Sequence, residues 1–133
     1  MKHLCISDTK KQILYASRHY PGIVHDKTML EEESREKSLP QKLTVLFDLA
    51  FLGVTIPNAV MPNKKPKGKE LTKSQRKKNR IISKKRVKIE NSFAGVKRLY
   101  ITYNVCRIKN ENIIDLVFNV SCGLWNYYVL TNY

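Results

Sequence analysis

Apolar and polar residues alternate at the start of the chain in the way that is typical of short β-strands. Residues 3–6 form one candidate strand, residues 8–11 are turn-like, and residues 12–16 form a second candidate strand. The sequence therefore predicts a β-hairpin over residues 3–17, which Tyr20-Pro21-Gly22 then breaks.

Helical spacing follows the hairpin. Asp26 is a suitable N-cap for a helix from about Lys27 to Lys37, and Pro40 ends that element. Residues 42–47 then form a short apolar run with β-branched content, which ends at Asp48. This run predicts a buried strand with an acid at its C-terminal end, a common site geometry in α/β sheets.

The second half of the chain alternates between a loop and long helices. Prolines and Gly68 predict a loop over residues 56–71. Thr72 can cap a helix that extends to about Leu99, with one apolar stripe formed by Ile82, Ile89, Phe93 and Val96.

Asn110 predicts the cap of a last helix over about residues 112–130. Asp115, Asn119 and Asn126 interrupt its apolar run, so we interpret it as a buried helix and not as a membrane span. We expect Trp125, Tyr127 and Tyr128 to lie in the core.

Composition adds a strong electrostatic signal. The chain has 133 residues, 42% of them hydrophobic, which is enough for one domain or part of one. Its net charge is +14, and residues 62–98 hold fifteen Lys or Arg against Glu70 and Glu90, a net of +13. So concentrated a charge favours a polyanionic partner, nucleic acid ahead of an anionic membrane surface. The three cysteines form no CxxC pair, which argues against a zinc ribbon or a disulfide framework.

One carboxylate in the basic segment has a distinctive setting. In a helix, Arg86 and Glu90 lie one turn apart and Lys97 lies about two turns further on. The Glu90 carboxylate, a group that can bind a metal ion, then lies between two cations on one helix face. The simpler reading is a surface acid in an i,i+4 pair, which contributes only about 0.3–0.5 kcal/mol and needs no function.

Four blocks in this order carry a resemblance to a known family. Residues 21–26 are similar to a Gly-x-x-His-Asp segment, residues 48–53 to an Asp-x-Gly-Tyr-x-Gly motif, residues 62–66 to the loop that follows it, and residues 86–97 to an Arg-(3)-Glu-(6)-Lys motif. Together they resemble the DDE-superfamily transposases of the insertion-sequence and harbinger type. The resemblance covers nearly all of the chain.

The resemblance implies an α/β, RNase H-like fold and metal-dependent cleavage and strand transfer of DNA. Three carboxylates of that family hold two divalent ions, Mg²⁺ or Mn²⁺, which are hard ions that prefer oxygen ligands. By motif, Asp48 and Glu90 are the expected catalytic and metal-binding acids, Arg86 and Lys97 the expected DNA contacts, and Phe51 takes the place of the family's Tyr.

The implied partner is double-stranded DNA, as transposon ends and target, with an oligomer or an upstream-frame transposase half as further partners and no membrane. The location expected is the bacterial cytoplasm and nucleoid, or the nucleus of a eukaryote. The expected phosphate contacts are the basic side chains Lys64, Lys65, Lys77, Lys78, Arg80, Lys84, Lys85, Arg86, Lys88 and Lys97. For His25 and Asp26 a capping role is favoured, and the alternative is support of the metal ligands or positioning of DNA.

The chain also departs from the family pattern. The family's first catalytic Asp lies on a strand upstream of the segment matched by residues 2–4, and Asp8 falls in the hairpin turn. Ala50 replaces a Gly, and Ser83 stands where related signatures have Tyr. We therefore expect the C-terminal part of a catalytic domain, with little or no nuclease activity by itself. The alternatives are a non-catalytic DNA-binding remnant or regulator, and a basic RNA-binding protein such as a ribosomal protein.

Overall fold

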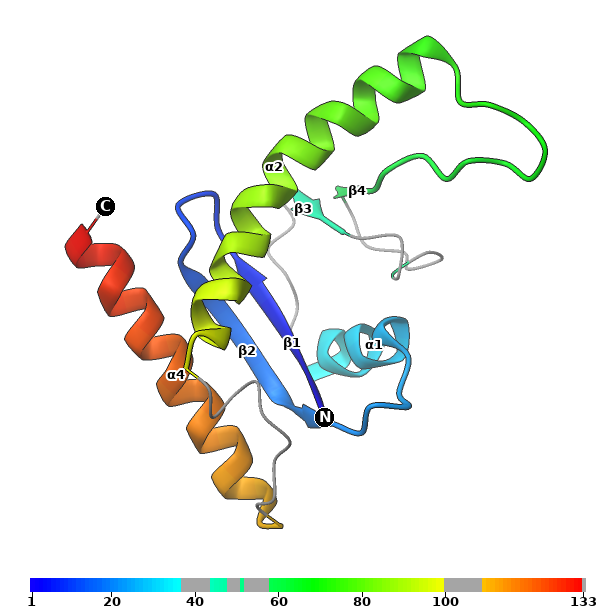
Figure 1. The fold of residues 1–133 in the computed structure, drawn as a ribbon. Helices are drawn as coiled ribbons and strands as arrows, with labels where there is room; N and C mark the ends of the chain where they lie inside the picture. Colours follow the sequence, from blue (N-terminus) through cyan, green and yellow to red (C-terminus); the bar gives the residue numbers. More distant parts are fainter. Residues whose placement is uncertain (37–43, 48–50, 52–57, 100–108, 133) are drawn as a thin grey trace. The chain divides into compact units, whose positions relative to one another are not determined.

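The computed structural model describes residues 1–36, 44–47, 51, 58–99 and 109–132. The chain divides into two compact units, Met1–Ile23 with Val87–Tyr133 and, separately, Val24–Arg86. Helices and two small sheets build these units, which agrees with the predicted α/β class (Figure 1).

The first unit begins with an antiparallel hairpin of β1 (Lys2–Ser7) and β2 (Ile13–Tyr20). Its turn is stabilised by the Asp8 carboxylate, which accepts hydrogen bonds from the N–H groups of Lys10 and Gln12, each at 2.9 Å. The predicted hairpin is confirmed, and β2 continues past the predicted end until Tyr20.

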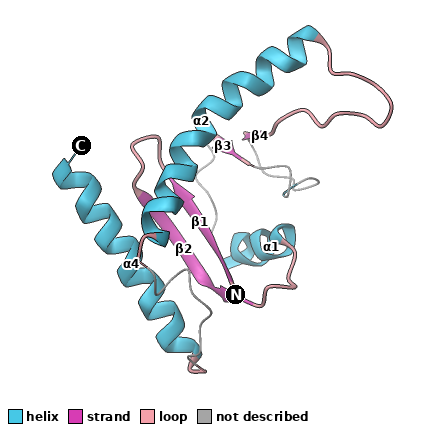
Figure 2. Ribbon diagram, in the orientation of Figure 1, coloured by secondary structure: helices cyan, strands magenta, loops and turns pink. Residues whose placement is uncertain are grey.

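Helix α4 (Glu111–Asn132) lies along β2 in the same unit (Figure 2). The Asn110 side-chain oxygen accepts from the N–H groups of Asn112 at 3.0 Å and Ile113 at 3.4 Å, which confirms the predicted cap. The buried core of the unit draws on the hairpin, α4 and the last turns of helix α2 (Lys73–Lys97): Ile13, Val96, Cys122, Trp125 and Val129.

Two adjacent side chains of α4 fix its register on the hairpin. The Trp125 indole N–H donates to the Lys11 carbonyl at 2.8 Å. The Asn126 amide accepts from the Ile13 N–H at 2.7 Å and donates to the Ile13 carbonyl at 2.8 Å. Asn126 interrupts an apolar run in the sequence, and in the structure its amide pairs with both backbone groups of Ile13.

The second unit contains α1 (Asp26–Glu36) and a parallel pair of two-residue strands, β3 (Val45–Leu46) and β4 (Ala59–Val60). Helix α1 begins at Asp26, and the His25 carbonyl accepts the first helical bond from Met29. Asp26 therefore lies in the first turn and is not the N-cap that we predicted. Strand β4 corrects the prediction of a loop over residues 56–71. The Val45 N–H donates to the Asn58 carbonyl, and the Phe47 N–H donates to the Val60 carbonyl.

The predicted strand 42–47 is described only from residue 44 onward, where Phe47 follows β3 and is 7% exposed. Lys42 and Leu43 lie outside the described residues.

Helix α2 (Lys73–Lys97) confirms the predicted long helix. The Thr72 hydroxyl accepts from the Gln75 N–H at 3.2 Å while the Gln75 side chain accepts from the Thr72 N–H at 3.0 Å, a reciprocal capping box. The predicted apolar stripe is confirmed as well: Ile82 and Val96 are buried, and Ile89 and Phe93 are half-buried.

Candidate nucleic-acid interface

Helix α2 concentrates positive charge to a degree that folding alone opposes. Ten of its residues are Lys or Arg, and Glu90 is its one acid. Arg80, Lys84 and Lys88 follow each other at four-residue intervals, so like charges lie one turn apart on an exposed face. Each such pair destabilises an isolated helix by about 0.2–0.5 kcal/mol. A polyanion along this face would turn the repulsion into attraction.

The other cations predicted on α2 also face solvent. Lys77, Lys78, Lys85 and Lys97 are exposed, and Arg86 is half-buried at the edge of the apolar stripe. The structure thus places the predicted phosphate contacts where a large ligand can reach them, without testing that role.

The loop before α2 is attached to the helix by amide hydrogen bonds. The Asn79 side chain accepts from the Asn63 N–H at 2.8 Å and donates to the Asn63 carbonyl at 3.0 Å. Lys65 forms an ion pair with Glu70, which Arg76 also approaches at 3.8 Å. Lys64 and Lys65, both predicted as DNA contacts, are exposed in this loop. Asn79 was missed by sequence reasoning, although an Asn on the buried side of a basic helix is a signal for such a role.

A groove of about 380 Å³ opens between β3–β4 and the N-terminal half of α2, entirely within the second unit. Its apolar wall consists of four aliphatic side chains: Leu46, Val60, Ile81 and Ile82. Three exposed lysines also line it: Lys77, Lys78 and Lys85. The groove thus combines apolar surface with exposed positive charge, which suits a ligand that has both an apolar face and anionic groups.

Comparisons with known proteins identify the family of this chain. The family model described as "DDE superfamily endonuclease" matches residues 1–126. This chain belongs to the DDE endonuclease superfamily. It is also 30% identical, over 111 residues, to a protein of Microchaete diplosiphon named "Probable transposase for insertion sequence element IS702". That match covers 82% of this chain and 39% of the relative, so the chain spans about two-fifths of the relative's length. No solved structure matches the chain.

The DDE endonuclease motifs can now be placed on the fold. Arg86, Glu90 and Lys97 lie on α2 as predicted, and the side chains of Glu90 and Lys97 are exposed. At about 100° per residue, Glu90 is roughly 40° and Lys97 roughly 20° around the helix from Arg86. The three side chains therefore share one face of α2, as their spacing predicts.

The second DDE motif is described in part. Asp48 lies outside the described residues, while Phe51, which takes the place of the family's Tyr, has its ring 5.5 Å from that of Phe47. Among the described residues no three His, Cys, Asp or Glu side chains are arranged to hold a metal ion. Glu90 supplies an oxygen donor, which is the type of ligand that the hard Mg²⁺ ion prefers.

His25 and Asp26, in the segment similar to Gly-x-x-His-Asp, lie at the start of α1. The His25 carbonyl takes the capping position, and the His25 side chain is exposed. The predicted capping role of the Asp26 side chain is wrong, and a role of either residue in metal support or DNA positioning stays a prediction.

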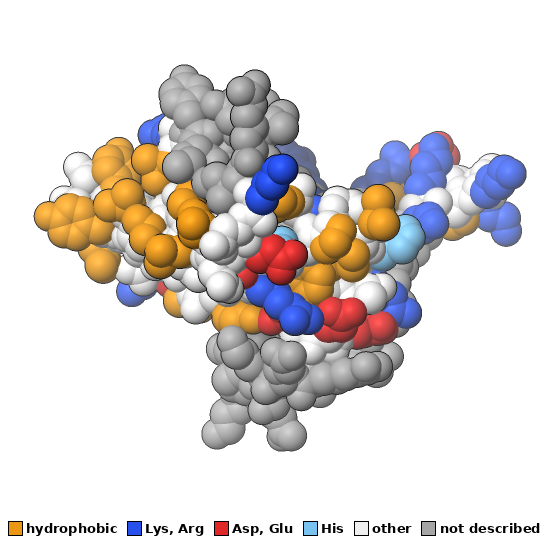
Figure 3. Space-filling model, turned by 90° about the horizontal axis from the view of Figure 1, so that it is seen from below, with side chains coloured by type: hydrophobic (Ala, Val, Ile, Leu, Met, Phe, Trp, Pro, Cys, Tyr) orange, Lys and Arg blue, Asp and Glu red, His pale blue; other side chains and the backbone are white. Residues whose placement is uncertain are grey.

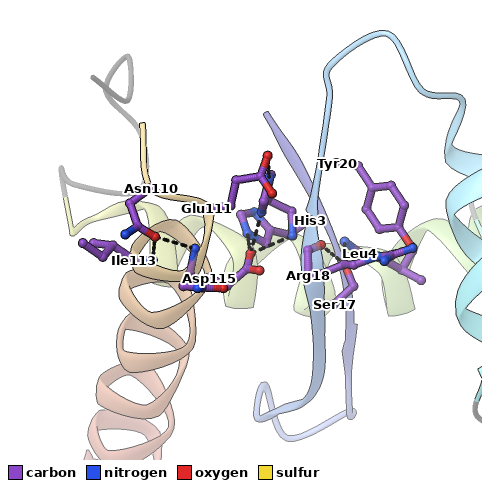
Figure 4. Close-up of polar contacts among 11 residues, drawn as sticks. His3, Leu4, Ser17, Arg18, Tyr20, Asn110, Glu111, Ile113 and Asp115 are labelled. Carbon is purple, nitrogen blue, oxygen red and sulfur yellow. Dashed lines mark hydrogen bonds and ion pairs between the residues drawn. The ribbon is translucent and has the colours of Figure 1, made fainter. Parts of the chain in front are cut away.

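Two histidines of the hairpin, His3 and His19, contact Asp115 of α4, and Figure 4 shows His3 beside that carboxylate. Asp115 accepts from the His19 backbone N–H at 2.7 Å and contacts the His19 ring nitrogen Nδ1 at 3.1 Å. The His3 Nε2 atom approaches the same carboxylate oxygen at 3.4 Å, and the His3 ring stacks on Phe118.

The surroundings in this cluster shift the pKa values of His3 and Asp115. Burial, which disfavours the charged ring, lowers the pKa of His3 despite the nearby carboxylate. Partial burial opposes ionisation of Asp115, but the hydrogen bonds from His19, with the nearby His3 ring, outweigh it and lower the pKa of Asp115. The cluster therefore holds together best with an ionised Asp115 and an uncharged His3.

The outer face of α4 corrects the prediction of a buried helix. Trp125 is in the core as predicted, but Tyr127 is 68% and Tyr128 43% exposed, so that prediction was wrong for both tyrosines. Other large apolar side chains on the same helix are exposed too: Ile113, Leu116, Val120, Leu124 and Leu130. They contribute to the orange surface on the left of Figure 3. By length and composition alone α4 could cross a membrane, with a mean hydropathy of 1.3, but its polar contacts with the hairpin fit a helix of a folded unit.

Proposed function

We propose that this chain acts on double-stranded DNA as part of a transposase, and that it holds the duplex backbone along α2. The observation that carries the proposal is the row of exposed, mutually repelling cations on that helix. Surface charge for solubility needs no such concentration, whereas phosphate binding does. Membership of the DDE endonuclease superfamily supplies the reaction class.

We assign the metal-binding acids of this function to Asp48 and Glu90, by their match to the family motifs and within an RNase H-like arrangement. Mg²⁺ or Mn²⁺ ions bound there would supply Lewis acidity and an activated water or 3′-hydroxyl for phosphodiester cleavage. Arg86 and Lys97 flank Glu90 on α2 and would hold the scissile strand's phosphates near that carboxylate by charge-assisted hydrogen bonds.

The first test concerns DNA binding and uses the full chain with a duplex of mixed sequence. We expect log K to fall linearly with log salt, with a slope near −0.9 per phosphate neutralised. A slope near zero would contradict binding through the phosphate backbone. Competition with an RNA duplex of the same sequence separates DNA from the RNA-binding alternative, because a basic RNA-binding protein should prefer the RNA.

The second test concerns cleavage. Two acids in these 133 residues match two of the family's three catalytic acids. We therefore expect the 133-residue chain to leave plasmid DNA uncleaved when Mg²⁺ or Mn²⁺ is present. Cleavage that disappears in Asp48→Ala would overturn this expectation and establish a complete active site.

A non-catalytic DNA-binding role is the second candidate. The exposed cations of α2 favour it, because they can bind phosphates without a metal ion. Titration calorimetry with Mn²⁺ distinguishes the two. Binding heat that is lost in both Asp48→Ala and Glu90→Ala supports the nuclease-derived site, whereas absence of Mn²⁺ binding with intact DNA binding supports the non-catalytic role.

A further inference from the structure

We propose that the groove between β3–β4 and α2 holds one unpaired nucleotide of DNA, with its base against the aliphatic wall and its phosphates against the lysines. This inference rests on the proposed DNA-binding function and assigns a distinct part of the surface to it. The groove volume, about 380 Å³, falls within the range of roughly 300–1,000 Å³ that is usual for pockets that bind small ligands.

The order of side chains along α2 fits this ligand. Lys77, Ile81 and Lys85 all line the groove and follow each other at four-residue intervals, so they share one face of the helix. With a rise of 1.5 Å per residue, each lysine lies about 6 Å along the axis from Ile81. A base that contacts Ile81 would therefore have a cation on either side for its 5′ and 3′ phosphates.

The exposure of Ile81 distinguishes this site from a plain phosphate-binding surface. Ile81 is 52% exposed in the middle of a lysine-rich helix, and Leu46 and Val60 extend the apolar surface beside it. Duplex DNA would use the lysines but leave this aliphatic wall against water, because the base faces of a duplex are stacked on each other. An unpaired base presents its face to the protein and can cover the wall.

The experiment compares three DNA ligands of the same sequence by fluorescence anisotropy with the full chain. The first is a blunt duplex. The second carries a two-nucleotide 3′ overhang in which both bases are 2-aminopurine. The third carries the same overhang with both nucleotides abasic. We expect the base-bearing overhang to bind about fivefold to tenfold more tightly than the abasic one, from burial of the base face. The 2-aminopurine emission should change on binding.

Two matched variants locate the effect. Ile81→Ser shortens the aliphatic wall at a half-exposed position and should remove the difference between base-bearing and abasic overhangs. Val87→Ser makes a comparable change at a residue of α2 that is 50% exposed and does not line the groove, and it should keep that difference. Both variants should bind blunt duplex as the wild type does.

The outcomes distinguish a failure of this inference from a failure of the proposed DNA-binding function. Equal affinity of the wild type for base-bearing and abasic overhangs, with duplex binding intact, overturns the nucleotide site alone. Absence of binding to all three DNAs overturns the proposed function as well. Binding to phosphatidylserine vesicles that Ile81→Ser abolishes, without any discrimination between overhangs, would assign the groove to a lipid and also overturn the inference.

Discussion

Helices α2 and α4 each bury one stripe of side chains, and they differ in what they expose. On α2 the stripe ends in Val96, which joins the core of the first unit, and nine of the helix's ten Lys and Arg residues are exposed. On α4 the buried face contains Trp125 and Val129, the outer face is apolar, and the helix has no Lys or Arg at all.

The difference shows that the buried residues of a helix and its exposed residues answer to different requirements. The buried stripes are needed for folding, whereas the exposed faces reflect what the helix meets afterwards. Cations in rows on α2 match a polyanion. A large exposed apolar surface such as that of α4 is typical of surfaces that other molecules cover.

The largest effect should come from the buried side of α4. Trp125→Ala removes a side chain that is 8% exposed and its hydrogen bond to Lys11, so we expect the free energy of unfolding to fall by about 3–5 kcal/mol. Leu124→Ala, at a neighbouring position that is 53% exposed, should change it by less than about 0.5 kcal/mol. Urea unfolding followed by circular dichroism measures both, and equal losses would show that the outer face of α4 is packed.

The outer face of α2 should affect binding more than folding. We expect the triple variant Arg80→Gln, Lys84→Gln, Lys88→Gln to bind duplex DNA about 10- to 100-fold more weakly at low salt and to reduce the salt slope by about 3. Its melting temperature should stay the same or rise, because like-charge pairs are removed.

A matched control for the triple variant uses three lysines outside residues 62–98, namely Lys10, Lys27 and Lys109, changed to Gln. Equal loss of affinity in this control would show that overall charge and not the face of α2 holds DNA.

The caps allow a smaller and symmetrical test of the two helices. Thr72→Ala removes the hydroxyl that caps α2, and Asn110→Ala removes the amide oxygen that caps α4. Each should lower the free energy of unfolding by about 1 kcal/mol. Thermal unfolding measures the loss, and a Thr72→Ser variant that keeps the hydroxyl should behave almost as the wild type.

The smallest effect expected is on pH dependence, through the cluster that joins α4 to the hairpin. Because the pKa of His3 is lower in the folded chain than its ordinary value of 6.5, the unfolded chain binds more protons as the pH falls through 6.5. Stability should therefore decrease from pH 7 towards pH 5 and level off below the folded pKa of His3. The lowered pKa of Asp115 adds a further loss in more acidic solution, below its ordinary value of 3.8.

His3→Asn should flatten the step near pH 6.5, and His25→Gln, at an exposed position outside the cluster, should keep it. Denaturation midpoints measured at intervals between pH 7 and pH 5 give the comparison. A wild-type midpoint that rises as the pH falls would contradict the assigned state of His3.

Much of the local structure could be predicted because its causes are local. The hairpin turn at Asp8, the cap of α2 at Thr72 and the cap of α4 at Asn110 each depend on residues within four positions of one another. The face shared by Arg86, Glu90 and Lys97 follows from helical geometry once a helix is assigned. The motif blocks indicated the family, which the comparisons confirm.

Other features depend on residues far apart in the chain, and no local pattern contains them. Strand β4 is a strand because its partner β3 lies beside it, although its own neighbourhood is proline-rich. Asn126 and Asp115 looked like interruptions of an apolar helix until the hairpin supplied their partners, Ile13 and His19. Gly95 matters because the Trp125 ring occupies the space that a Cβ would need.

The sequence by itself determined the charge of α2, the N-caps of α2 and α4 and the family, since these are carried by residue types and short-range spacing. Tertiary structure decided which face of α4 is buried, since large apolar side chains lie on its exposed face as well as on its packed one. It also decided that Ile81 and three lysines line one groove with Leu46 and Val60, because such a surface exists only where separate elements pack together.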